Sequence, residues 1–190
     1  HKNFIGDFQA VKMKTDQENI IEKSMGPRAK STAEAYYGSF SYADAHLQAS
    51  VLTEQYSPDY DAQLGFFNQS NIRRYKAKIG YDFLPEKPYF VQGGPRFNYE
   101  YAEDWKGVVL DRRAIFKFVC RTYKNTIVSL FMEKSFERSW RGIGYDKDIV
   151  WGFNLQSAPS KYLSFSASYV IGDDVQYEEE YLGYKKSFIF

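Results

Sequence analysis

Apolar and polar residues alternate with a period of two along most of the chain, and helical spacing is scarce. In residues 74–83, apolar side chains alternate with Arg74, Lys76, Lys78, Gly80 and Asp82. The same alternation recurs at strand-length intervals in residues 47–51, 96–101, 151–156 and 163–171. Because successive side chains of a strand point to opposite sides, this pattern predicts β-strands with one apolar and one polar face.

The connections between these segments are expected to alternate between short and long. Short links at residues 103–107, 121–125 and 157–161 are typical of tight hairpin turns. Longer polar links are expected at residues 14–31, 137–148 and 172–180, and only residues 17–23 favour a helical turn. The chain therefore predicts an all-β, antiparallel up-and-down meander of about nine or ten strands. We expect one domain, residues 1–190. Arg112 is an exception to the alternation, since it shares a face with Leu110, Ala114 and Phe116.

Composition narrows the choice of protein class. Aromatic residues make up 19% of the chain although its mean hydropathy is −0.54, which excludes a disordered chain. No apolar run is long enough for a transmembrane helix. A net charge of +1 gives no electrostatic reason to expect nucleic acid as a partner. The single cysteine, Cys120, excludes a disulfide framework and a zinc-thiolate cluster.

Two environments fit a two-faced sheet. In a soluble sandwich or small barrel the apolar face points inward, whereas in an outer-membrane barrel it meets lipid and the polar face lines a wet lumen. Aromatic residues near strand ends, polar faces of charges and small residues, and links of uneven length favour the membrane. The alternative is a soluble, secreted β-sandwich or β-barrel that binds glycans through aromatic residues in its loops.

One stretch carries a family resemblance. Residues 60–75 place a Gly-Phe strand end, a short polar link and an Arg-Arg-Tyr strand start in succession. Further matches follow in order at Gly94-Pro95-Arg96, Gly107 with Leu110-Asp111-Arg112, Phe136-Glu137-Arg138, and Ser164 to Tyr169. Together these segments resemble the bacterial family known as domain of unknown function 5916. Ala62 and Gln69 depart from its pattern, since Pro and Arg are frequent there.

The resemblance implies part of a transmembrane β-barrel in a bacterial outer membrane. Members of that family often carry a preceding domain similar to carbohydrate-binding module family 9, which this chain lacks. Because the family's barrel region is longer than 190 residues, we expect a fragment truncated at both ends. Its partners would be membrane lipid, the missing barrel strands and carbohydrate, and the resemblance brings no catalytic residues. The expected role is non-enzymatic: anchoring or serving a carbohydrate-handling module at the surface or in the periplasm.

Two groups of residues are candidates for binding. The first would line the lumen, as an anion-selective lining or as a surface for acidic glycans. Alternatively, its cations pair with Asp82, Glu100 or other acids across strands, and pairing is favoured because the net charge is small. This first group comprises Arg74, Lys76, Lys78, Arg96 and Glu100. The second could stack on sugars from the longer links, although girdle or loop packing accounts for the same residues. It comprises Trp140, Tyr145, Tyr177 and Tyr181.

Other polar residues suggest weaker hypotheses. His46 follows Asp44 by two residues, which permits a barrel-embedded hydrolase, but a histidine at a hairpin is the simpler interpretation. The acidic residues of segment 172–180 could hold calcium, although their spacing matches no EF-hand and a solvated loop is favoured. We therefore expect no catalytic, cofactor-binding or metal-binding residues.

Overall fold

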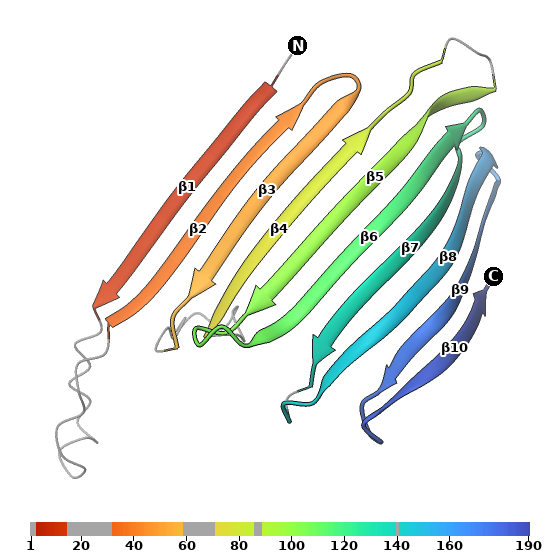
Figure 1. Cartoon of the computed structure of the whole chain (residues 1–190). Helices are drawn as coiled ribbons and strands as arrows, with labels where there is room; N and C mark the ends of the chain where they lie inside the picture. The colour runs from red at the N-terminus through yellow and green to blue at the C-terminus, as the bar shows by residue number, and fades with distance from the viewer. Residues whose placement is uncertain (1–2, 15–31, 59–70, 86–88, 140) are drawn as a thin grey trace, which may run out of the picture.

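Ten strands form a single antiparallel sheet in which each strand pairs with the next along the chain (Figure 1). This computed structural model describes residues 3–14, 32–58, 71–85, 89–139 and 141–190. The all-β, up-and-down prediction is confirmed. The strands are β1 (Asn3–Lys14), β2 (Thr32–Ala43), β3 (Leu47–Tyr56), β4 (Ile72–Tyr81), β5 (Phe90–Glu103), β6 (Val109–Thr122), β7 (Thr126–Arg138), β8 (Gly144–Ser160), β9 (Leu163–Gln176) and β10 (Tyr181–Ile189).

The described residues contain no helix that is long and apolar enough to cross a membrane. The helical turn expected at residues 17–23 lies outside the described residues. The resemblance-bearing link between β3 and β4 is also largely outside them, because residues 59–70 are not described.

The two ends of the sheet carry connections of different length. At one end, which we call the short-turn end, the links after β2, β4, β6 and β8 contain two to eight residues. At the opposite end, which we call the loop end, the links after β1 and β3 contain 17 and 15 residues and the other three contain four or five. Both chain termini lie at the short-turn end (Figure 1). The predicted inequality of the links is therefore present, but it is concentrated in the first two loop-end links.

Several strands run further than their alternation predicted. β7 ends at Arg138 and β8 begins at Gly144, so the long link expected at residues 137–148 is a turn of five residues. β8 continues through Pro159 to Ser160, and β9 continues to Gln176. The ladders contain register shifts between Glu133 and Ser135 and between Ser157 and Ser160. Such irregularities let strands continue where strict alternation is lost.

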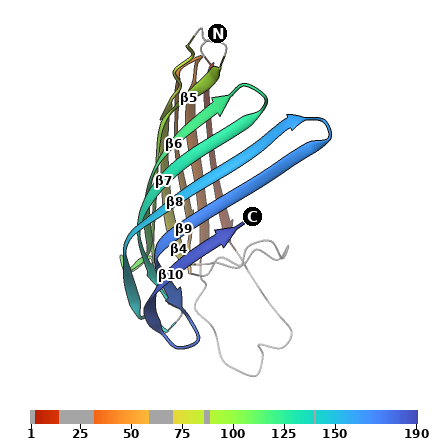
Figure 2. The ribbon, with the colours of Figure 1, turned by 90° about the vertical axis from the view of Figure 1, so that its right-hand side faces the viewer.

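The sheet is curved like part of a cylinder (Figure 2) and its two sides differ in chemistry. Side chains on the concave side of a curved sheet converge and shield one another. The polar face is the better shielded one, since Asp82 is 1% exposed and Ser129 is 4% exposed. On the other face, Leu130 is 58% exposed and Trp151 is 55% exposed. We therefore assign the polar face to the concave side and the apolar face to the convex side.

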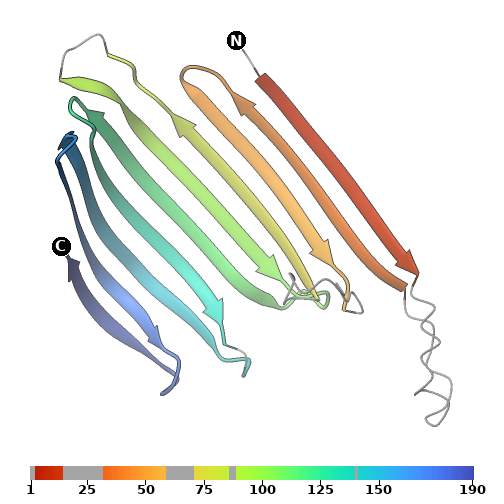
Figure 3. The ribbon, with the colours of Figure 1, turned by 180° about the vertical axis from the view of Figure 1, so that it is seen from behind.

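The sheet is open among the described residues. β1 pairs only with β2, β10 pairs only with β9, and the two edge strands do not pair with each other (Figure 3). Each edge therefore carries backbone groups without a neighbouring strand, and these groups can accept a further strand.

Candidate functional site

Ion pairs run across the concave face from β3 to β7. Arg74 lies 3.3 Å from Glu54 and 3.6 Å from Glu100, and Lys76 lies 3.4 Å from the same Glu100. The ladder continues on the next strands, where Arg113 Nε donates to Glu133 at 2.7 Å. Strand pairing brings these residues together, because Glu54 is the register partner of Arg74 and Glu100 that of Lys76 and Arg113. The favoured prediction, that these cations pair with acids across strands, is confirmed for Arg74 and Lys76.

A buried carboxylate sits at the short-turn end of this face. Asp82, just beyond β4, accepts a 2.6 Å hydrogen bond from Arg96 Nη2 and a 3.3 Å bond from Gln48 Nε2. Arg96 can lie flat across β4 because residue 80 is glycine, and a Cβ there would come within 2.7 Å of Arg96 Nη1. We call this group of Asp82, Arg96 and Gln48 the clasp, and it joins β3, β5 and the end of β4. Of the predicted lining residues, Lys78 alone has no ion pair among the described residues.

His46 and Asp44 lie in the turn between β2 and β3, and each makes hydrogen bonds that hold this turn. The Asp44 carboxylate accepts hydrogen bonds from the backbone N–H groups of Leu47 and His46 and from the Tyr42 hydroxyl. These bonds lower the pKa of Asp44 to about 2, with the Leu47 bond contributing most. The His46 ring bonds the Asp82 carbonyl through Nδ1 at 2.8 Å. Both residues therefore act in turn formation, as the simpler interpretation of His46 predicted.

No ring contact joins the three predicted loop aromatics that the structure describes, Tyr145, Tyr177 and Tyr181. Tyr145 is the second residue of β8 and is only 6% exposed, so it is not the exposed loop ring that the sequence suggested. Tyr177 and Tyr181 are exposed, at the turn after β9 and at the start of β10. The Tyr177 hydroxyl donates to Glu137, which raises the pKa of Tyr177 to about 12. Trp140 lies outside the described residues.

The acidic residues of segment 172–180 are distributed among separate partners. Asp174 pairs with Lys185 at 2.9 Å, Glu180 pairs with Arg141 at 3.0 Å, and Asp173 accepts the backbone N–H of Asp148. Within the described parts of the chain, no group of three or more His, Cys, Asp or Glu side chains could hold a metal ion. These acids instead tie the last two hairpins together at the loop end.

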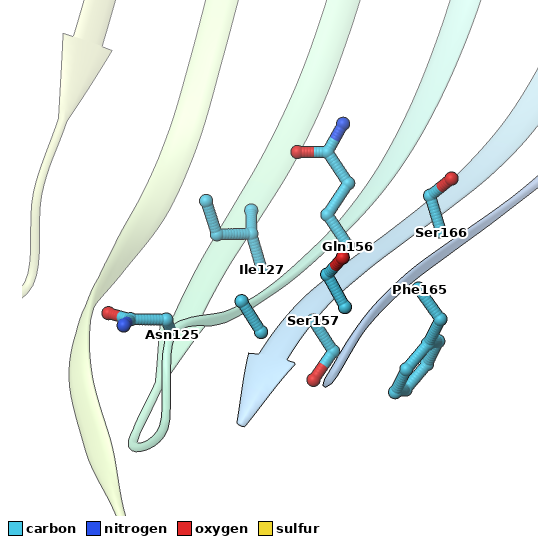
Figure 4. Close-up of a pocket in the computed structure, with 8 residues that line it drawn as sticks. Asn125, Ile127, Gln156, Ser157, Phe165 and Ser166 are labelled. Atoms are coloured by element: carbon cyan, nitrogen blue, oxygen red, sulfur yellow. The ribbon is translucent and has the colours of Figure 1, made fainter. Parts of the chain in front are cut away.

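A shallow cavity of about 410 Å³ lies at the short-turn end of β7, β8 and β9 (Figure 4). Gln156 and Ser166 line it from neighbouring strands, where they are register partners, and Asn125 lines it from the preceding turn. Serine and amide side chains share its wall with Ile127, Ala158 and Phe165. It offers hydrogen-bonding groups but no charged or titratable group.

Large apolar side chains cover most of the convex face, which Lys186 on β10, the register partner of Ile171, interrupts. Its exposed large residues include Val51, Ile79, Phe97, Phe116, Leu130, Trp151, Tyr169 and Phe188, from β3 to β10. Register places them beside one another: Ile79 is opposite Phe97, Phe97 is opposite Phe116, and Trp151 is opposite Met132. Arg112, which broke the predicted alternation, does lie on this face, 4.0 Å from Asp146.

Sequence reasoning missed two features of this region. The first is the partner of Asp82: pairing of strand cations with Asp82 was expected, but nothing in the local sequence names Arg96 as the cation that it holds. The second is the burial of Tyr145. The register shift between Glu133 and Ser135 makes Lys147 and Tyr145 partners of Ser135 and Glu137, on the opposite face from Trp151. In the sequence, a strand that contains one extra residue loses its alternation, and this looks the same as the start of a loop.

Comparisons of the chain with models of protein families, with curated proteins and with solved structures found no match.

Proposed function

We propose that the chain forms part of the wall of a β-barrel in a bacterial outer membrane, with its convex face in lipid and its concave face lining a polar interior. The observation that carries this proposal is the contrast between the faces. Large apolar side chains are exposed across the convex side, whereas the described residues bury only five hydrophobic side chains: Ala35, Ile72, Ala102, Tyr145 and Val175. Soluble monomers rarely expose so large a contiguous apolar surface.

Two further features support this environment. Aromatic residues such as Tyr81, Phe83, Tyr123 and Tyr162 are exposed at the short-turn end, where an interfacial girdle would lie. At the loop end of the convex face, Arg112, Lys134, Asp146 and Asp148 form exposed ion pairs, which suits headgroups or water and not hydrocarbon. The short-turn end would face the periplasm and the loop end the exterior.

The open edges are part of the same proposal. Lipid does not tolerate unpaired backbone groups, so β1 and β10 must each be covered in the membrane, by one another or by further strands. We also infer a non-enzymatic role, in which the barrel anchors or serves a carbohydrate-handling module. That link to carbohydrate, and membership of the resembled family, rest on the sequence resemblance.

Fractionation tests the membrane location. We expect the protein to sediment with outer membranes, to resist extraction by alkaline carbonate, and to require detergent for solubility. Recovery in the soluble periplasm would overturn the proposal. Binding of the detergent-free chain to a glycan array would then favour the soluble glycan-binding alternative, to which the described aromatics lend less support because Tyr145 is buried.

A further inference from the structure

The charge of the concave face is distributed unevenly. Toward the loop end, the cations Arg74, Lys76 and Arg113 meet acids. Toward the short-turn end, four cations project from β4, β5 and β6, and we call them the basic patch: Lys78, Arg96, Lys117 and Arg121. Among the described residues, the only ion pair that the basic patch makes is between Arg96 and Asp82. The basic patch therefore contains four cations, of which only Arg96 is paired with a carboxylate among the described residues.

Strand register holds these cations close together. Arg96 on β5 and Lys117 on β6 are direct partners, and directly opposed residues have Cβ atoms about 5 Å apart. Lys78 is opposite Asn98, which makes it the diagonal neighbour of Arg96 at about 7–8 Å. Lys117 and Arg121 are four residues apart on β6 and share its concave side. Like charges placed opposite one another destabilise a sheet. A bound counter-charge would offset this repulsion.

The nearest acids are already engaged. Asp82 is buried and draws the Arg96 guanidinium over Gly80 toward β3, which is the side of β5 away from Lys117. Glu100 contacts Arg74 and Lys76. Glu133 contacts Arg113 at 2.7 Å. The register partner of Lys117 on β7 is Phe131, whose ring covers Gly152. The described residues therefore do not neutralise the patch.

We propose that the basic patch binds a small oxyanion group of the phosphate or sulfate type, either free or carried by a sugar. Such a group presents several strong acceptor oxygens and a charge near −2, which suits Lys78 and Lys117, two lysines that share one face and make no ion pair among the described residues. The amide of Asn98 lies between β4 and β6 on the same face and can donate a further hydrogen bond. This assignment deepens the proposed function, because it gives the polar interior a preference for anionic solutes.

The test uses the full chain folded in detergent micelles, with inorganic phosphate as the probe at constant ionic strength. Lysine acetylation, followed by mass spectrometry, measures how far each amine is shielded. We expect phosphate to slow the acetylation of Lys78 and Lys117 saturably, and Lys76 to be unaffected. Lys117→Gln should weaken phosphate binding about tenfold, the loss of one charge-assisted hydrogen bond. Lys76→Gln, on the same face of β4, is the matched control and should leave binding unchanged.

Two results would overturn the site: protection that chloride reproduces at equal ionic strength, or protection that is equal at Lys76. The wild-type footprint needs no variant, so a misfolded Lys117→Gln chain does not remove the test. A sulfated or phosphorylated sugar that competes more strongly than phosphate would identify the carrier, and weaker competition would identify the free ion. A chain that inserts into vesicles without phosphate protection overturns the patch alone. Saturable protection in a chain that is soluble without detergent supports the patch and overturns the membrane location.

Discussion

The two faces of the sheet differ in the chemistry and in the exposure of their side chains. On the convex face, large apolar side chains such as Leu130 and Trp151 are more than half exposed, and almost no polar group interrupts them between the turns and the charged loop end. On the concave face, charged and hydroxyl side chains are packed closely enough to bury Asp82, Ser129 and Ser135. The comparison shows that ion pairs and hydrogen bonds connect the strands on the concave face, whereas between its turns and its charged loop end the convex face presents exposed apolar side chains.

The largest expected effect comes from placing a charge on the convex face. Leu130→Arg should lower the free energy of unfolding by about 2–4 kcal/mol in lipid vesicles, because a cation would lie in hydrocarbon. Denaturant titration in vesicles measures this. Gln156→Arg, an exposed position on the concave face, is the control and should cost less than about 1 kcal/mol. Equal losses at the two positions would contradict the assignment of the faces.

Among substitutions on the concave face, removal of the buried Asp82 carboxylate should lower the free energy of unfolding most. Asp82→Ala leaves Arg96 without its partner and should cost about 2–3 kcal/mol of unfolding free energy. Asp174→Ala removes a more exposed pair with Lys185 and should cost at most about 1 kcal/mol. Chemical denaturation of both variants makes the comparison. A smaller loss in Asp82→Ala than in Asp174→Ala would show that the clasp does not hold the concave face together.

Close packing on the concave face can be tested without changing a charge. A Cβ at Gly152 would lie 2.1 Å from the Phe131 ring, so Gly152→Ala forces that ring to move. We expect a loss of about 1–3 kcal/mol of unfolding free energy, as is typical of overpacking. Combining it with Phe131→Leu should recover part of the loss in a double-mutant cycle. Strictly additive losses would mean that the two side chains do not share this space.

The smallest effect concerns pH at the turn between β2 and β3. Hydrogen bonds from the Leu47 and His46 N–H groups and from Tyr42 lower the pKa of Asp44 from 3.8 to about 2. A carboxyl with a lowered folded-state pKa stabilises the fold above its unfolded pKa, and this contribution disappears as the pH falls toward about 2. Unfolding measured from about pH 5 to pH 2 should therefore show a component that Asp44→Asn lacks. An identical pH dependence in both proteins would rule out this role.

The sequence predicted the faces well because alternation is a local property. Tyr75, Ile79 and Phe97 lie on the apolar face that their spacing indicated, and Arg112 shares that face as expected. Strand ends were predicted less well, since β8 runs through Pro159 and both β7 and β9 extend into segments that looked like polar links. Polar residues at the end of a sheet are compatible with a strand or with a loop. Pairing with the neighbouring strand decides which of the two forms.

By itself, the sequence determined the period of two, the identity of the apolar and polar residues, and the up-and-down order, because these depend on spacing along one chain. Only the tertiary structure decided which charges meet. Arg96 reaches Asp82 and Gln48 across two neighbouring strands, Tyr145 is buried by a register shift, and Lys117 makes no ion pair with any described residue. These outcomes depend on register between strands and on the curvature of the sheet. They bring together residues that are far apart in the chain, so no local pattern contains them.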